Sequence, residues 1–167
     1  MAALQLLNKK QIGQKLDRMA YQIMEDTSDD EEIIIAGIAD RGYVIAVMLK
    51  AIIEKLSTQK LTLIKISLDK EGSSLQAHTD LNLKICEDKS VIVVDDVLNT
   101  GKSLTYGLGV FLNLRIKKLR TAVLVDRSHK LFPIDSDFTG LEIATVAHEH
   151  VSVILGEVGH EDCVMLE

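Results

Sequence analysis

Two adjacent carboxylates, Asp95 and Asp96, directly follow a run of four β-branched residues, Val91 to Val94. Such a run is typical of a strand that is buried on both faces of a parallel sheet. The next polar residues have the composition of a turn and precede an apolar pattern with helical spacing: Asn99, Thr100, Gly101, Lys102 and Ser103. Free backbone N–H groups and the positive end of a helix dipole point at such a turn and make it an anion site. We therefore expect a phosphate site beside two carboxylates that accept from hydroxyls or contact a metal.

Three interpretations of this segment compete. A nucleotide-binding P-loop has a glycine five positions before the glycine that precedes its lysine, and Asp96 occupies that place here. A ribose 5-phosphate site fits better, because the carboxylates accept from ribose hydroxyls while the turn amides hold the phosphate. The third interpretation is an acidic pair that caps an ordinary turn between a strand and a helix in another α/β protein.

Length and composition predict one domain spanning residues 1–167, with 47% hydrophobic and 26% charged residues. The net charge of −6 argues against a tail that grips nucleic acid non-specifically. No apolar run approaches the ~20 residues of a membrane span, and the first residues do not resemble a signal peptide. Cys86 and Cys163 are isolated, which predicts neither a disulfide framework nor a thiolate metal site. We expect a cytoplasmic protein.

Apolar periodicity predicts helices and strands that alternate along the chain. Helices are expected at residues 8–24, 43–55 and 103–114, and strands at 33–38, 61–68, 91–94 and 121–125. The stretches 69–80 and 81–86 are interpreted as a mobile loop and a short strand. Alternating strands and helices form a parallel sheet with right-handed crossovers. Short segments at 142–147, 151–155 and 163–166 predict a small β-rich cap beside this sheet, so the fold class is α/β.

The Asp-pair segment resembles the signature of the type I phosphoribosyltransferases, in which a hydrophobic strand, two acidic residues and a Thr-Gly turn bind phosphoribosyl pyrophosphate. A second turn, Ala39-Asp40-Arg41-Gly42, is similar to the loop with which that family binds pyrophosphate. Gly42 permits close backbone approach and Arg41 adds positive charge, so this turn suits an anion. The resemblance implies catalytic roles for Asp95, Asp96 and Arg41, a 5′-phosphate site at 99–103 and a pyrophosphate site at 39–42.

The region from Ala122 to Gly140 narrows the resemblance to the PyrR family, regulators of pyrimidine operons that also have uracil phosphoribosyltransferase activity. The similarity extends over nearly the whole chain. It implies a type I phosphoribosyltransferase fold, a parallel sheet flanked by helices with a β-rich hood contributed mainly by residues 126–167. The base-binding residues implied in this hood are Arg127, Phe138, Thr139 and Gly140. Mg²⁺ is implied as a cofactor bound mainly through phosphoribosyl pyrophosphate, with no direct protein ligand, and a dimer or larger homo-oligomer is expected.

The implied reaction transfers ribose 5-phosphate from phosphoribosyl pyrophosphate to a pyrimidine base, most directly uracil, and yields uridine monophosphate and pyrophosphate. One alternative is a catalytically weak or inactive nucleotide-sensing regulator of the PyrR type. Another is a phosphoribosyltransferase for a different nucleobase.

Three departures from the family pattern modify these expectations. The family's flexible loop is longer and begins with an aromatic-Arg-Asp-Asp run, where this chain has Ser67-Leu68-Asp69-Lys70-Glu71. Asp40 stands where the family usually has Thr, which places a negative charge beside an anion. Both departures predict slow turnover. The surface that would meet RNA offers Arg18 and Tyr21 among acidic residues, so RNA binding is not expected.

Overall fold

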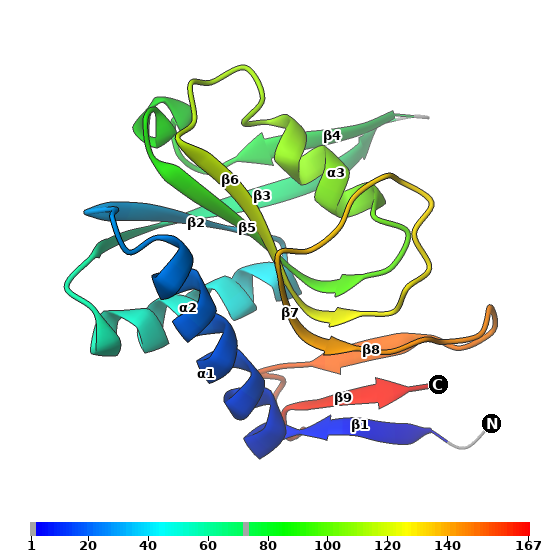
Figure 1. Ribbon diagram of the computed structural model, residues 1–167. Helices are drawn as coiled ribbons and strands as arrows, with labels where there is room; N and C mark the ends of the chain where they lie inside the picture. Colours follow the sequence, from blue (N-terminus) through cyan, green and yellow to red (C-terminus); the bar gives the residue numbers. More distant parts are fainter. Residues whose placement is uncertain (1–2, 72–73) are drawn as a thin grey trace.

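A computed structural model describes residues 3–71 and 74–167 of the chain (Figure 1). Its main sheet has six strands in the order β4-β3-β2-β5-β6-β7. Their bounds are β2 Glu32–Ile38, β3 Lys60–Glu71, β4 Ser74–Thr79, β5 Ser90–Leu98, β6 Lys118–Asp126 and β7 Phe138–Glu142. All neighbouring strands pair in parallel except β3 and β4, which are antiparallel. The predicted α/β fold with a mainly parallel sheet is confirmed.

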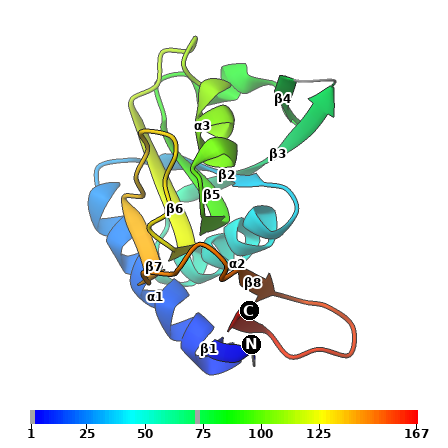
Figure 2. The same cartoon turned by 90° about the vertical axis from the view of Figure 1, so that its right-hand side faces the viewer.

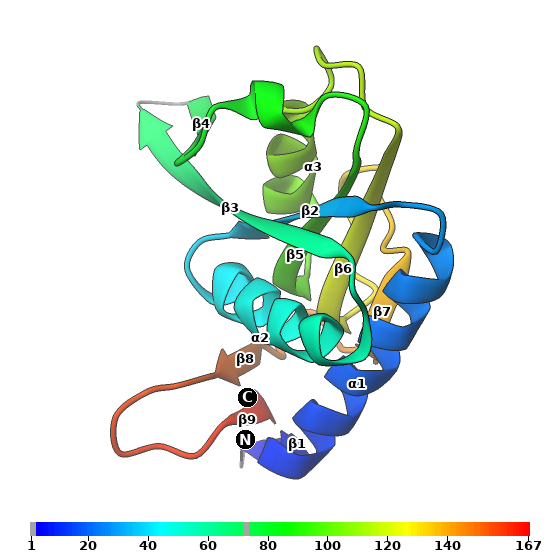
Figure 3. The ribbon, with the colours of Figure 1, turned by 90° about the vertical axis from the view of Figure 1, so that its left-hand side faces the viewer.

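Helices cover both faces of this sheet (Figure 3). Helices α1 (Lys9–Asp26) and α2 (Arg41–Leu56) share one hydrophobic core with alternate residues of β2, β5 and β6, while α3 (Lys102–Gly109) packs on the opposite face. Helix α1 buries a stripe with helical spacing: Ile12, Leu16, Met19, Ala20 and Ile23. It begins in a capping box, in which Asn8 and Gln11 exchange hydrogen bonds between side chain and backbone. The central strands are apolar on both faces because each face is covered.

The hood is a separate three-stranded antiparallel sheet in the order β1-β9-β8 (Figure 2). Its strands are β1 Leu4–Asn8, β8 Val151–Ile154 and β9 Cys163–Leu166. The predicted β-rich hood is therefore present, but it also takes in β1 at the N-terminal end of the chain. The strand predicted at 142–147 is wrong: the structure has β7 at 138–142 instead, and β7 extends the main sheet beside β6.

Two other local predictions differ from the structure. Within the stretch 69–80, interpreted as a mobile loop, residues 69–71 belong to β3 and 74–79 to β4, which pair as an antiparallel hairpin, while residues 72–73 lie outside the described residues. Cross-strand backbone pairing organises this polar stretch although its composition suggested a loop. Residues 81–86 include a 3₁₀ helix, η1 (Leu83–Cys86), in place of a strand. The Asn82 side chain accepts from the Lys84 N–H and so favours a local turn.

Candidate active site

A cavity of about 730 Å³ opens at the carboxyl ends of the parallel strands. Crevices at that edge are where open α/β sheets bind ligands. The cavity brings together the two turns singled out in the sequence and the acidic pair between them. Its described lining residues are Ile38, Ala39, Asp40, Arg41, Leu68, Asp69, Leu75, Asp95, Asp96, Val97, Thr100, Lys102 and Ser103. Four of these are Asp and two are Arg or Lys, so the cavity favours a ligand that carries cations or hydroxyls beside its phosphates.

The acidic pair lies inside β5 and not just beyond it, because the strand continues to Leu98. One Asp95 carboxylate oxygen accepts from the Asp96 N–H at 2.9 Å, and an Asp96 oxygen accepts from the Val97 N–H at 2.9 Å. Asp95 is only 8% exposed. Burial, together with the neighbouring Asp96 charge, raises the pKa of Asp95 well above its ordinary value. Burial thus disfavours the ionised form of Asp95. Ligand hydroxyl groups that donate to this carboxylate would stabilise the ionised form, which suits a polyhydroxylated sugar.

The segment after β5 forms a small hollow of about 120 Å³ in front of α3. Gly101 has a φ of +83°, a left-handed conformation that glycine adopts without a steric penalty, and it makes no side-chain capping bond to the helix. A helix has no internal partners for its first-turn N–H groups, and at α3 the Lys102 N–H donates to the Thr100 hydroxyl at 3.3 Å. The Thr100 carbonyl accepts from the N–H groups of Leu131 at 2.8 Å and Phe132 at 3.0 Å. These bonds join the turn to the segment that follows β6. This geometry fits the predicted phosphate site at 99–103.

The turn between β2 and α2 packs directly against the acidic pair. A Cβ on Gly42 would lie 2.6 Å from the Val94 carbonyl oxygen and 2.9 Å from the Asp95 Cα, so only glycine allows this approach. Arg41 lines the cavity, and its guanidinium lies 3.8 Å from the Glu157 carboxylate of the hood. Residues of the predicted pyrophosphate turn and of the predicted phosphate turn thus line one cavity with Asp95 and Asp96 of β5.

The residues predicted to bind the base in the hood are not placed at this cavity. Arg127 is buried, with Nε donating to the Thr145 hydroxyl at 3.0 Å and Nη2 to the Glu149 carbonyl at 2.7 Å. Its guanidinium therefore orders the segment that leads to the hood. Phe138, Thr139 and Gly140 belong to β7 of the main sheet, which pairs with β6.

Sequence reasoning did not assign binding roles to several residues that line the cavity. Leu68, Asp69 and Leu75 come from the β3–β4 hairpin, and Ile38 and Val97 come from strand ends. Ile38 and Val97 could have been predicted from the sequence, because each lies close to a predicted turn. The hairpin residues could not, since their position at the cavity depends on antiparallel pairing between polar segments.

The phosphoribosyl transferase domain family matches residues 2–155. Solved structures agree with this fold. A hypoxanthine phosphoribosyl transferase from Trypanosoma cruzi superimposes with a TM-score of 0.79 at 17% identity, covering 98% of this chain and 91% of that one. A hypoxanthine-guanine phosphoribosyltransferase from Bacillus anthracis gives a TM-score of 0.72 at 24% identity, covering 83% and 81%. The chain belongs to the phosphoribosyltransferases of type I fold.

Curated relatives narrow this assignment. The bifunctional protein PyrR of Clostridioides difficile (strain 630) is 33% identical, covering 98% of this chain and 97% of its own. The bifunctional protein PyrR of Alkaliphilus metalliredigens (strain QYMF) is 34% identical, covering 97% and 93%. Within the phosphoribosyltransferases, the chain is a member of the PyrR family. Across the described residues, none of the helices combines the length and apolar character needed to cross a membrane.

Proposed function

We propose that this chain transfers ribose 5-phosphate from phosphoribosyl pyrophosphate to uracil, releasing pyrophosphate and forming uridine monophosphate. One observation carries the proposal: a single cavity joins an amide-rich turn before α3, a carboxylate pair on β5 and an arginine-bearing turn before α2. These three parts match the 5′-phosphate, the ribose hydroxyls and the pyrophosphate of one substrate. Membership of the PyrR family supports uracil as the base.

In the proposed reaction the bond between ribose C1 and a pyrophosphate oxygen breaks, and its electron pair leaves with pyrophosphate. C1 then bonds to a ring nitrogen of uracil, whose proton passes to the released pyrophosphate or to water. The sugar passes through a cationic, oxocarbenium-like state. Asp95 and Asp96 accept from the ribose hydroxyls and lie where negative charge stabilises this cation, while Arg41 attracts the departing anion. Fixing both ends of the substrate supplies the orientation that the transfer needs.

The donor set of the cavity fits Mg²⁺ carried by the substrate. Carboxylate oxygens are ligands that this hard cation accepts, and Asp95 and Asp96 line the cavity. Within residues 3–71 and 74–167, however, no group of three His, Cys, Asp or Glu side chains gathers as a metal site. Phosphate and hydroxyl oxygens would therefore supply most ligands. When bound, the ion neutralises charge on the pyrophosphate that leaves.

A nucleotide sensor with little turnover is the second candidate function. The β3–β4 hairpin favours a sensor with little turnover. Its described residues at the cavity are Leu68, Asp69 and Leu75, and none of these is cationic. The described hairpin residues at the cavity therefore add no positive charge for the departing pyrophosphate. Both functions use the same binding site, so they differ in turnover and not in ligand.

A panel of nucleobases with phosphoribosyl pyrophosphate and Mg²⁺, read out as pyrophosphate release, separates these functions. We expect release with uracil at a rate below the ~1–10³ s⁻¹ usual for enzymes. The Asp95→Asn/Asp96→Asn variant is the inactive control. No release with any base, while the wild-type protein still binds uridine monophosphate, would establish the sensor. Faster pyrophosphate release with a purine than with uracil would show that the substrate is another base.

A further inference from the structure

The phosphate turn rests on the β6–β7 loop, residues 127–137. The Thr100 carbonyl accepts from the N–H groups of Leu131 and Phe132 in this loop. The peptide between Thr100 and Gly101 is trans, so its carbonyl and its N–H point in opposite directions. Because the loop holds the carbonyl, the Gly101 N–H is turned away from the loop. The loop backbone therefore sets the direction of one amide donor of the phosphate turn.

The carboxylate of Asp126, at the end of β6, depends on the same loop. Its side chain is only 5% exposed. One carboxylate oxygen accepts from the Ser128 N–H at 2.8 Å, and the other lies 3.2 Å from the Lys130 ammonium. A buried carboxylate is costly unless it is both hydrogen-bonded and paired with a cation. The need of Asp126 for these two partners therefore favours one conformation of the loop that supplies them.

Lys130 directly precedes the two residues that hold the Thr100 carbonyl. Its ammonium also lies 2.5 Å from the Asp135 carboxylate, but that side chain is 81% exposed. Exposed ion pairs contribute little, whereas loss of the cation beside a buried carboxylate leaves a charge without its partner. The contact with Asp126 is therefore the one that ties the loop backbone to the end of β6.

We propose that Lys130 is a positioning residue of the phosphate turn, because its ion pair with Asp126 fixes the loop N–H groups that hold the Thr100 carbonyl. The inference rests on the proposed role of this turn in binding the 5′-phosphate. Lys130 is not among the described residues that line the cavity or the hollow in front of α3. It acts through the loop backbone and not by contact with the ligand.

Calorimetric titration of the full chain with ribose 5-phosphate tests this role. We expect Lys130→Gln to weaken binding by about three- to tenfold, at or slightly above what an exposed ion pair contributes, because its partner is buried. Lys130→Arg keeps the charge and should bind as the wild type does. Pyrophosphate with Mg²⁺, which the proposed function places at the turn before α2, should bind all variants equally.

Asp126→Asn tests whether Lys130 acts through this carboxylate. Without the buried charge the cation has no partner to neutralise, so Asp126→Asn/Lys130→Gln should bind ribose 5-phosphate as Asp126→Asn does. Lys89→Gln is the matched control, because Lys89 is also 29% exposed and pairs with Glu32 at 3.1 Å. It lies at the opposite end of β5 from the phosphate turn, and its variant should keep the wild-type affinity.

Circular dichroism verifies that each variant is folded. Unchanged ribose 5-phosphate affinity in Lys130→Gln, an equal loss of pyrophosphate affinity, or a double variant weaker than Asp126→Asn would overturn the inference. A wild-type protein that does not bind ribose 5-phosphate would overturn it together with the phosphate site. Selective loss of ribose 5-phosphate binding in Lys130→Gln would support it even if no base were transferred, because the titration measures binding and not turnover.

Discussion

Glu157, in the loop between β8 and β9, lies 3.8 Å from Arg41 at the first turn of α2. This ion pair joins the hood to the turn that we propose for pyrophosphate. Both side chains are about half exposed, at 52% for Arg41 and 48% for Glu157, so the pair is weak and exchangeable. A ligand phosphate that binds Arg41 would meet a carboxylate already paired with its guanidinium.

Glu157→Gln should therefore strengthen pyrophosphate binding by about two- to fivefold, because it removes a competitor worth up to ~1 kcal/mol. Calorimetry at low ionic strength measures the change. Glu161→Gln, an exposed carboxylate in the same loop, is the control and should bind as the wild type does. Equal affinities for both variants would show that Glu157 and the ligand do not compete for Arg41.

Gly101→Ala should disrupt the phosphate turn. The added Cβ would meet the Ile134 side chain at 2.5 Å in a backbone conformation with φ of +83°. A non-glycine residue in such a conformation costs about 1–2 kcal/mol before the clash is counted. We expect lower thermal stability and at least tenfold weaker binding of uridine monophosphate.

Gly109→Ala provides the comparison in the same helix, because nothing lies within 4 Å of its Cβ position. It should preserve nucleotide affinity and stability. If both glycine variants bound uridine monophosphate as tightly as the wild type, the turn at 99–103 would not be the phosphate site.

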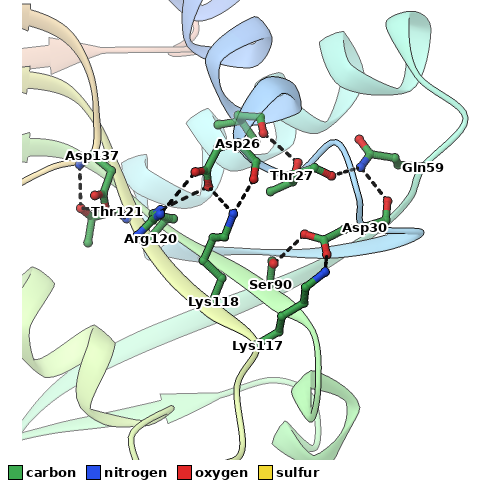
Figure 4. Close-up of polar contacts among 11 residues, drawn as sticks. Asp26, Thr27, Asp30, Gln59, Ser90, Lys117, Lys118, Arg120, Thr121 and Asp137 are labelled. Atoms are coloured by element: carbon green, nitrogen blue, oxygen red, sulfur yellow. Dashed lines mark hydrogen bonds and ion pairs between the residues drawn. The ribbon is translucent and has the colours of Figure 1, made fainter.

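Asp30 belongs to a polar network where the strands of the main sheet begin (Figure 4). Its carboxylate accepts from the Ser90 hydroxyl at 2.6 Å and from the Lys117 ammonium. Partial burial alone would raise the pKa of Asp30, but the hydrogen bonds from Lys117 and Ser90 and the nearby positive charges outweigh it and hold this pKa below 3.8. The ionised form is therefore favoured by folding.

A carboxyl group with a lowered folded-state pKa stabilises the fold above its unfolded-state pKa. We expect Asp30→Asn to lower the free energy of unfolding at pH 7 by about 1–2 kcal/mol, a discounted figure for lost charge-assisted hydrogen bonds. The difference from wild type should shrink as the pH falls below 3.8. Urea unfolding over this range measures it, with the exposed Asp29→Asn as control. A difference that grows toward acid would contradict the assignment.

The sequence predicted the central sheet and the two turns at 39–42 and 99–103 because these rest on local patterns. Val91 to Val94 form a buried strand, and the glycines at 42 and 101 occupy places where backbone approach or a left-handed turn requires them. Features that depend on strand pairing were missed. The 69–80 segment has a polar composition although it pairs as a hairpin, and the addition of β1 to the hood depends on pairing with β9 at the other end of the chain.

The hood residues show a different limit of sequence reasoning. Resemblance implied that Arg127 binds the base, but its hydrogen bonds to Thr145 and Glu149 can be read only from the folded chain. The Asp40–Lys65 and Arg41–Glu157 pairs also join residues far apart in the sequence. Periodicity and turn composition therefore do not predict which side chains of different elements pair.

Arg18, the cation expected on a surface that would face RNA, is engaged within the fold. Its Nη2 donates to the carbonyls of Thr139 at 3.0 Å and Gly140 at 2.6 Å, which holds α1 against β7. RNA loop recognition needs cations for phosphates and planar groups for unstacked bases. A gel shift with pyrimidine-operon leader RNA and uridine monophosphate should show no tight, sequence-selective complex at physiological salt. Such a complex would restore a regulatory role on RNA.

The central claim is that Asp95 and Asp96 bind the ribose of phosphoribosyl pyrophosphate. Calorimetric titration of wild-type protein and of Asp95→Asn/Asp96→Asn with this compound and Mg²⁺ tests it most directly. Each lost charge-assisted hydrogen bond contributes about 1.5–3 kcal/mol, so the variant should bind at least tenfold more weakly while its circular dichroism spectrum is unchanged. Equal affinity in the two folded proteins would contradict the account.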